Sequence, residues 1–277
     1  MNDLFHGDWG LSHSQADEPV LSVIRRTFPA TFELAIFATL IQVIAGLPLG
    51  IFSAVKKDKP LDHASRLLAL SGASFPIFWL ALLMQFAFFY QLKLHGLPYL
   101  PSTGQVDAFV LLDHPVKTIT GFLILDSLLE WNIPVLKDAL LHIIMPGFCL
   151  AFTGLGLITR ITRSSMLEVM KQDYVTLARA KGLPERVVIY KHALKNAITP
   201  SITIIGTSFG FTLAGAPLTE TIFSWPGMGK WAAFAIVSLD RASIMAFALV
   251  TGVIFVLVNL IVDVLYSVVD PRIRYGE

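Results

Sequence analysis

The feature that most constrains this chain is a set of apolar segments, each about as long as a bilayer is thick. Residues 31–55, 66–92, 142–158, 198–216 and 244–266 are predominantly apolar, and polar stretches separate them. A helix needs about 20 such residues to cross the hydrocarbon core, where the backbone must satisfy its own hydrogen bonds. The pattern therefore predicts an all-α polytopic membrane protein with about five transmembrane helices.

Composition supports this class and excludes others. The 277 residues are 55% hydrophobic and 15% charged, whereas about 25% of the residues of a typical soluble domain are charged. The net charge of +1 gives no sign of a nucleic-acid partner. The single cysteine, Cys149, lies in an apolar run and the seven histidines are scattered. We therefore expect membrane lipid as a partner, and no nucleic acid, metal site or cofactor.

The structure of the segments between the predicted spans is inferred from their proline, glycine and charged residues. Residues 93–137 are rich in proline and read as a loop with a short interfacial helix, although 119–136 could be a marginal extra span. Residues 217–243 read as a polar loop. The second span has a possible break at Phe75–Pro76, because proline removes a backbone donor.

Orientation follows from the distribution of basic residues, which are more frequent in cytoplasmic loops. One side of the predicted topology carries 14 of the 21 Lys and Arg residues and the other side carries 7. The richer side is therefore predicted to be cytoplasmic, together with the C-terminus. This divides the chain into an extracytoplasmic segment (1–28), a membrane domain (29–270) and a cytoplasmic tail (271–277).

A hydrophilic loop at residues 160–197 contains eight of these basic residues and is too long and patterned for a simple connector. We predict a helix over 166–181 that ends before Gly182, followed by a new helix that starts at Pro184–Glu185. The bend would expose Ala178, Ala180 and Gly182, so that the backbone of a partner could approach closely. The alternative is a solvated loop whose charges only fix the topology.

The same loop carries a family resemblance. Residues 173–183 read Asp-Tyr-Val-Thr-Leu-Ala-Arg-Ala-Lys-Gly-Leu, and His-Ala-Leu-Lys-Asn-Ala follows at 192–197. This resembles the cytoplasmic loop of the permease subunits of binding-protein-dependent ABC importers, in their dipeptide/oligopeptide/nickel branch. The general family has a Glu-Ala-Ala-x-x-x-Gly pattern, from which Thr176 and Leu177 depart. The Ala-Arg-Ala-Lys-Gly core is similar to the peptide branch.

The resemblance extends over nearly the whole chain. Similar landmarks occur at 29–35, 75–80, 100–104, 144–146, 160–167, 220–229, 259–266 and 270–274. Members of this branch usually begin with one more membrane helix, followed on the outside by a Gly-Asp-x-Gly pattern, which starts here at Gly7. We therefore expect that the usual first helix is missing, through a truncated or mis-started reading frame, or is supplied otherwise.

The resemblance implies the type I ABC importer permease fold and ATP-driven alternating access for peptides, nickel chelates or oligosaccharides. It also implies four partners: a second homologous permease, two ATP-binding subunits and an extracytoplasmic solute-binding protein. Hydrolysis of ATP would belong to the partners, so this chain is not expected to be an enzyme. The implied residues for coupling to the ATPase are Tyr174, Ala178, Arg179, Ala180, Lys181, Gly182 and Leu183.

Two other classes remain as alternatives. A secondary carrier or channel driven by an ion gradient would need paired ionisable groups at mid-membrane, and a membrane-embedded hydrolase would need a catalytic motif. Neither is found in the sequence. Glu33, Asn259 and Asp263 are predicted to lie near span ends, with packing roles at least as plausible as functional ones. The segment 220–229 is either a substrate-access element or an ordered loop with Trp225 at the membrane interface.

Overall fold

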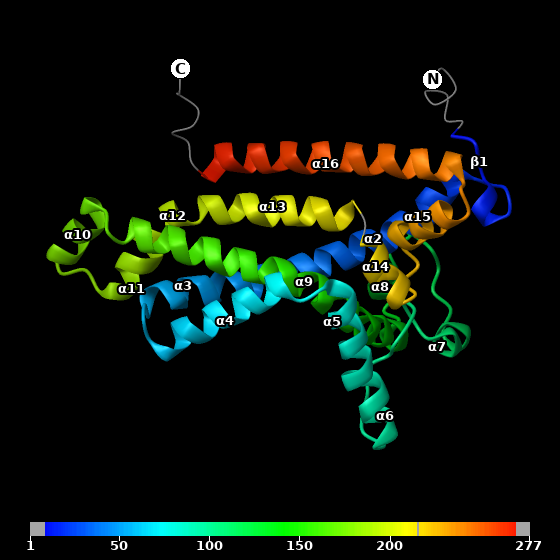
Figure 1. Cartoon of the computed structure of the whole chain (residues 1–277), viewed down its shortest axis with the longest axis horizontal. Coiled ribbons are helices and arrows are strands. Elements are labelled where there is room, and N and C mark those ends of the chain that lie inside the picture. The colour runs from blue at the N-terminus through cyan, green and yellow to red at the C-terminus, as the bar shows by residue number, and fades with distance from the viewer. Residues whose placement is uncertain (1–8, 215, 270–277) are drawn as a thin grey trace. The chain divides into compact units, whose positions relative to one another are not determined.

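The computed structural model describes residues 9–214 and 216–269, which are mostly helical (Figure 1). Strand β1 (Leu11–Ser12) pairs antiparallel with β2 (Glu18–Pro19) around the short helix η1 (His13–Gln15). The first half of the chain then forms α2 (Val20–Ile41), η2 (Gln42–Gly46), α3 (Leu47–Val55), α4 (Pro60–Ser74), α5 (Ile77–Met84), η3 (Gln85–Gln91), α6 (Leu92–Leu94), α7 (Ala108–Asp113) and α8 (Leu123–Leu129).

The second half begins with the longest helix, α9 (Ile133–Val169). It continues through α10 (Asp173–Ala180), α11 (Glu185–Val187), η4 (Val188–Ala193), α12 (Leu194–Ala197), α13 (Thr199–Leu213), α14 (Pro217–Ile222), α15 (Met228–Val237) and α16 (Arg241–Val269). The tail at 271–277 and the Gly7–Asp8 part of the N-terminal pattern lie outside the described residues.

The all-α membrane class is confirmed. Four helical stretches of the described chain are long and apolar enough to cross a membrane: Val20–Val55, Ile77–Leu94, Ile133–Val169 and Arg241–Val264. The predicted span at 198–216 corresponds to α13, which has 15 residues and is shorter than these four. The expected break at Phe75–Pro76 is present, because α4 ends at Ser74 and α5 begins at Ile77.

The prediction for the start of the first span was wrong, since α2 begins at Val20 and continues through Pro29. The span was expected to start at Thr31 because the residues before it are more polar. Membrane helices tolerate proline where neighbouring groups satisfy the freed backbone. Here Val20, Val23 and Ile24 are buried against Met228 and Trp231, and this packing favours helix upstream of the proline.

The loop predictions were partly right. Residues 95–132 do form a loop with short helices, α7 and α8, but 133–137 already belong to α9. The seven-residue α8 is too short to be an extra span. Residues 217–243 are not simply a polar loop, because they form α14 and α15. Pro217 stands in the first turn of α14, where its missing N–H costs nothing, and Pro226–Gly227 only separates the two helices.

The described chain forms two compact units. Unit 1 takes in the described parts of 1–38, 76–150 and 211–255. One of its cores joins Val20, Val23 and Ile24 to Met228 and Trp231. A second core joins Ala81, Met145, Cys149 and Phe223.

Unit 2 takes in the described parts of 39–75, 151–210 and 256–277. Its helices approach closely at glycines. A Cβ on Gly50 of α3 would lie 2.6 Å from Thr162 Cβ of α9, and one on Gly72 of α4 would lie 2.6 Å from the Phe152 carbonyl oxygen. Residue Thr162 also shares a buried hydroxyl–hydroxyl hydrogen bond of 2.8 Å with Ser201 of α13. Both α3 and α4, as well as α13, are therefore packed on the C-terminal half of α9.

Candidate functional site

The predicted coupling residues lie on α10 and the turn that follows it, within unit 2. The predicted continuous helix over 166–181 was wrong: α9 ends at Val169, and α10 starts at Asp173 after a turn. In this turn the amides of Lys171 and Gln172 donate to Glu168 O and Val169 O. The break redirects the chain, so that α10 packs as a separate short helix.

One face of α10 is buried. Val175 and Ala178 belong to a hydrophobic cluster with residues of α3, α9, η4 and α12, namely Ile51, Ala54, Met166, Val188, Ile189, Ala193 and Ala197. Burial of apolar surface is the main favourable term in such packing. This face therefore fastens α10 to the helices of unit 2. The prediction that Ala178 is exposed was wrong, because its side chain fills this cluster.

The bend after α10 is a glycine-terminated helix end. The amide of Gly182 donates to Arg179 O at 2.9 Å, and that of Leu183 donates to Ala178 O at 3.4 Å. These two bonds form a Schellman motif, which requires a left-handed residue just past the helix. Gly182 has a φ of +74°, so its lack of a Cβ makes this conformation accessible. The predicted helix end before Gly182 is confirmed, as is the start of a helix at Pro184–Glu185.

Two polar contacts connect α10 to the segment beyond the bend. The Arg179 guanidinium donates to both carboxylate oxygens of Glu185, with Nε–Oε2 at 3.2 Å and Nη2–Oε1 at 2.8 Å. This guanidinium lowers the pKa of the Glu185 carboxyl below its ordinary value. The pair is largely exposed to solvent and adds little stability. Asn196 Nδ2 donates to the Tyr174 hydroxyl at 2.8 Å.

The opposite face of α10 and the bend form a surface with apolar side chains exposed to solvent. Leu177 is 55% exposed, and Tyr174 and Leu183 are also exposed. Arg179, Ala180, Lys181 and Gly182 are exposed as well. We call the set Tyr174, Leu177, Arg179, Ala180, Lys181, Gly182 and Leu183 the α10 surface. Of the seven predicted coupling residues, the structure places six on this surface and buries Ala178.

Sequence reasoning missed Asp62, which lies in the first turn of α4 and is fully buried. Arg163 of α9 donates to both of its oxygens, at 2.7 and 2.9 Å, and Ser53 Oγ donates at 2.6 Å. The Arg163 guanidinium, helped by these other donors, holds the pKa of Asp62 well below its usual range. Two acids, Asp58 and Asp62, among the four basic residues of 56–66 were the available signal.

In unit 1 the segment 220–229 packs around the carboxylate of Glu220. Glu220 is fully buried and accepts from Thr31 Oγ1 at 2.9 Å and from the Lys230 amide at 2.8 Å. Trp225 is also fully buried, and its Nε1 donates to Ala30 O. The expectation of Trp225 at the membrane interface was therefore wrong. These contacts account for the segment as an ordered element, which is one of the two predicted alternatives.

Glu33 also differs from its expected place near a span end. It lies well inside α2 and is largely buried. Its carboxylate accepts from Gln105 Nε2 and from the Ile124 amide, both at 2.7 Å. These contacts tie the 93–137 stretch to α2 within unit 1.

Comparison with known proteins identifies the family. Residues 46–275 match the family described as binding-protein-dependent transport system inner membrane component, and the chain belongs to that family. It is therefore an inner-membrane permease component of an ABC importer, as the resemblance of its motifs had indicated.

Individual relatives are similar over almost the whole chain. The probable D,D-dipeptide transport system permease protein DdpB of Escherichia coli (strain K12) is 47% identical over 276 residues, covering 100% of this chain and 78% of that protein. The dipeptide transport system permease protein DppB of Alkalihalophilus pseudofirmus is 42% identical over 275 residues, covering 99% of this chain and 80% of that protein.

The fold has a solved counterpart in a structure of the MetNI methionine ABC transporter in an inward-facing conformation. The TM-score is 0.64 at 13% sequence identity, with 91% of this chain and 99% of that chain covered. At this identity the likeness concerns the fold alone, and it confirms the type I importer permease fold.

Proposed function

We propose that this chain is the permease subunit of an importer that moves dipeptides or chemically similar solutes by ATP-driven alternating access. The two relatives described above are permease proteins of dipeptide systems, and their identity of 42–47% supports the substrate class. In this proposal the chain pairs with a second homologous permease and two ATP-binding subunits. An extracytoplasmic solute-binding protein delivers the solute, and the C-terminus is cytoplasmic.

The coupling step is assigned to the α10 surface. Closure of the ATP-binding subunits pushes on this surface, and the buried face of α10 passes the displacement to α3, α9 and α12. Interfaces of this kind respond by rigid-body movement, since packed cores are not continuously deformable. The helix α9 is 37 residues long and carries the movement along the chain.

One observation supports the coupling role: one face of α10 is buried in unit 2, and its other face is exposed to solvent. Val175 and Ala178 are buried in the cluster of unit 2, whereas Leu177 on the same eight-residue helix is 55% exposed. A loop that only fixed topology would not need Tyr174, Leu177 and Leu183 together on its solvent side. A docked partner supplies the missing contact.

The test replaces Leu177 on the exposed face. We expect Leu177→Asp to lower dipeptide uptake by more than about tenfold and to weaken co-purification of the ATP-binding subunits, because a charge is costly in a desolvated interface. The matched control is Leu177→Met, which keeps volume and polarity and should retain uptake. Uptake, membrane insertion and co-purification are measured in cells that express the complete transporter.

Two results would contradict the proposal at different points. Unchanged uptake and co-purification in Leu177→Asp would refute the role of the α10 surface. No dipeptide uptake by the unaltered transporter, with normal assembly, would refute the substrate class and leave the coupling role intact.

A further inference from the structure

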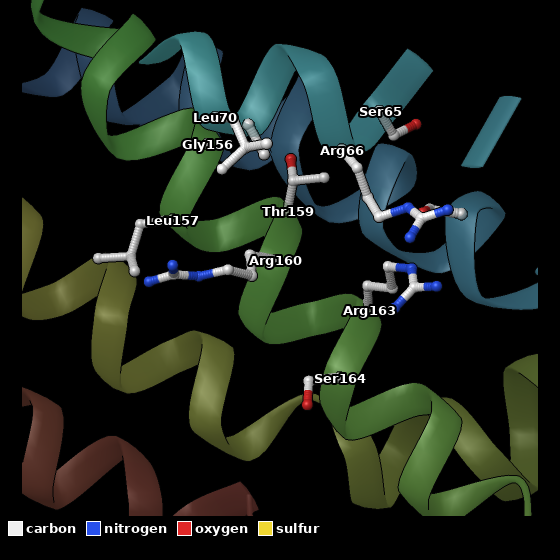
Figure 2. Close-up of a pocket in the computed structure, with 11 residues that line it drawn as sticks. Ser65, Arg66, Leu70, Gly156, Leu157, Thr159, Arg160, Arg163 and Ser164 are labelled. Carbon is white, nitrogen blue, oxygen red and sulfur yellow. The ribbon is translucent and has the colours of Figure 1, made fainter. Parts of the chain in front are cut away.

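A groove of about 330 Å³ lies in unit 2, along α4 and α9 (Figure 2). It is distinct from the α10 surface. It is lined by Ser53 of α3, by Ser65, Arg66, Ala69 and Leu70 of α4, and by Gly156, Leu157, Thr159, Arg160, Arg163 and Ser164 of α9. The coupling role proposed above uses none of these side chains.

One part of the groove is apolar. A Cβ on Gly156 would lie 2.5 Å from the Ala69 carbonyl oxygen, so α4 and α9 are in direct backbone contact there. Leu70 and Leu157 stand beside this contact with their side chains exposed. Apolar walls around a close helix contact fit a hydrocarbon chain, since such a chain needs no hydrogen-bond partner there.

The groove also carries excess positive charge. Arg66, Arg160 and Arg163 line it, and Asp62 neutralises one of these three cations, which leaves a net charge of +2. Figure 2 shows the guanidinium groups of Arg66 and Arg163 near each other, whereas the Arg160 side chain points away from them and ends beside Leu157.

These cations are not equally available to a ligand. Arg163 is bound in the bidentate pair with Asp62. Arg66 is exposed, lies 3.7 Å from Asp62 Oδ1 and contacts His63 Nδ1 at 2.8 Å. Arg160 is exposed and has no hydrogen-bond or ion-pair partner in the described part of the chain. Arg66 and Arg160 therefore leave positive charge for an anion, and the Arg66 guanidinium matches the geometry of a phosphate.

The groove's place in the membrane follows from the proposed orientation, on which this inference rests. Helix α4 starts directly after Lys56, Lys57 and Lys59, in the basic turn assigned to the cytoplasmic side. Anionic headgroups are concentrated in that leaflet, and basic pockets between membrane helices on that side bind them.

We propose that this groove binds one anionic phospholipid, with its phosphate on Arg66 and an acyl chain along Ala69, Leu70 and Leu157, while Arg160 adds positive charge beside Leu157. The ligand is amphiphilic because the groove has both an apolar part and excess positive charge. A free inorganic anion would leave the apolar part uncovered, and a neutral phospholipid would leave the net positive charge uncompensated.

The test measures lipid retention by the purified transporter that contains this chain. The complex is reconstituted in nanodiscs of phosphatidylcholine with 30% phosphatidylglycerol, and then released and examined by native mass spectrometry. We expect retained phosphatidylglycerol in excess over phosphatidylcholine. The double variant Arg66→Gln/Arg160→Gln should lower this retention about tenfold, and each single variant should lower it less. Arg241→Gln removes an exposed arginine outside the groove and should retain lipid like the unaltered chain.

Three outcomes would overturn the proposal. The first is a failure of either retention comparison: the unaltered chain retains the two lipids equally, or the double variant retains as much phosphatidylglycerol as the unaltered chain. The second is full thermal stabilisation by glycerol 3-phosphate alone, which assigns a free-anion site. The third is loss of the second permease from the double variant, which assigns the groove to a protein interface. Lipid retention does not depend on which solute is transported. A transporter that takes up no dipeptides can therefore still retain the lipid, so the two proposals can fail separately.

Discussion

Buried carboxylates illustrate how single residues hold each unit together. In unit 1, Asp126 accepts from the amides of residues 119–121, and Asp240 accepts from Ser12 Oγ and from the Ser14 amide. Glu220 and, in unit 2, Asp62 are held in the same manner. A buried charge is tolerated only when donors satisfy it. Hydrogen bonds within each unit therefore account for the burial of these four acids, and no bound solute is needed to explain it.

The Glu220 site leads to a prediction at this scale. A Cβ on Gly227 would lie 2.5 Å from both Glu220 Oε2 and Thr31 Oγ1, whereas one on Gly252 would meet nothing within 4 Å. Gly227 has extended backbone angles that alanine adopts freely, so the effect of Gly227→Ala is purely steric. We expect it to lower the free energy of unfolding by about 1–3 kcal/mol, measured by thermal unfolding in detergent.

Gly252→Ala is the matched control and should leave the unfolding temperature equal or slightly higher, because alanine favours the helix. Equal unfolding temperatures for the two variants would show that the Glu220 site relaxes around the added methyl group.

At the scale of elements, the break between α9 and α10 decides what the hydrophilic loop can do. A continuous helix would have carried Val175 and Ala178 away from the cluster that now buries them. The turn at 170–172 and the left-handed Gly182 together make α10 an independent block with a buried and an exposed face. Such a block can be moved as a unit by a partner.

The prediction for this element concerns Gly182, at φ +74° with nothing near its missing Cβ. We expect Gly182→Val to raise hydrogen exchange across residues 173–187 and to lower uptake, since a β-branched residue there costs about 1–3 kcal/mol. Gly182→Asn should behave much like the unaltered chain, because asparagine tolerates the left-handed region. Equal exchange in the two variants would show that backbone strain at this position does not control the stability of α10.

At the scale of the whole molecule, the unequal distribution of basic residues supports the proposed orientation. The turn between α3 and α4 would be cytoplasmic and the 93–137 stretch extracytoplasmic. Cys149 is fully buried, so the chain provides its own unreactive background for labelling of introduced cysteines.

The corresponding prediction uses a membrane-impermeant maleimide on intact cells. Lys117→Cys should be labelled from outside, and Lys57→Cys should be labelled only after the membrane is opened, since both positions are exposed. The unaltered chain should not be labelled in either condition. The reverse pattern would invert the orientation and would also remove the premise for the lipid groove.

By itself the sequence determined the class, the approximate spans and the bend at Gly182. These depend on local quantities: the length of an apolar run, the loss of a donor at proline and the freedom of glycine. Motif resemblance identified the family correctly. It also located the segment that holds the candidate coupling residues.

The tertiary structure alone decided which side chains are buried. The start of α2 at Val20, the burial of Ala178 and Trp225, and the Asp62–Arg163 pair all join residues far apart in the chain. Local propensity is weak compared with the packing of an apolar face. For that reason α2 continues through Pro29. For the same reason the helix expected over 166–181 is divided into α9 and α10, and the second of these packs into the buried cluster of unit 2.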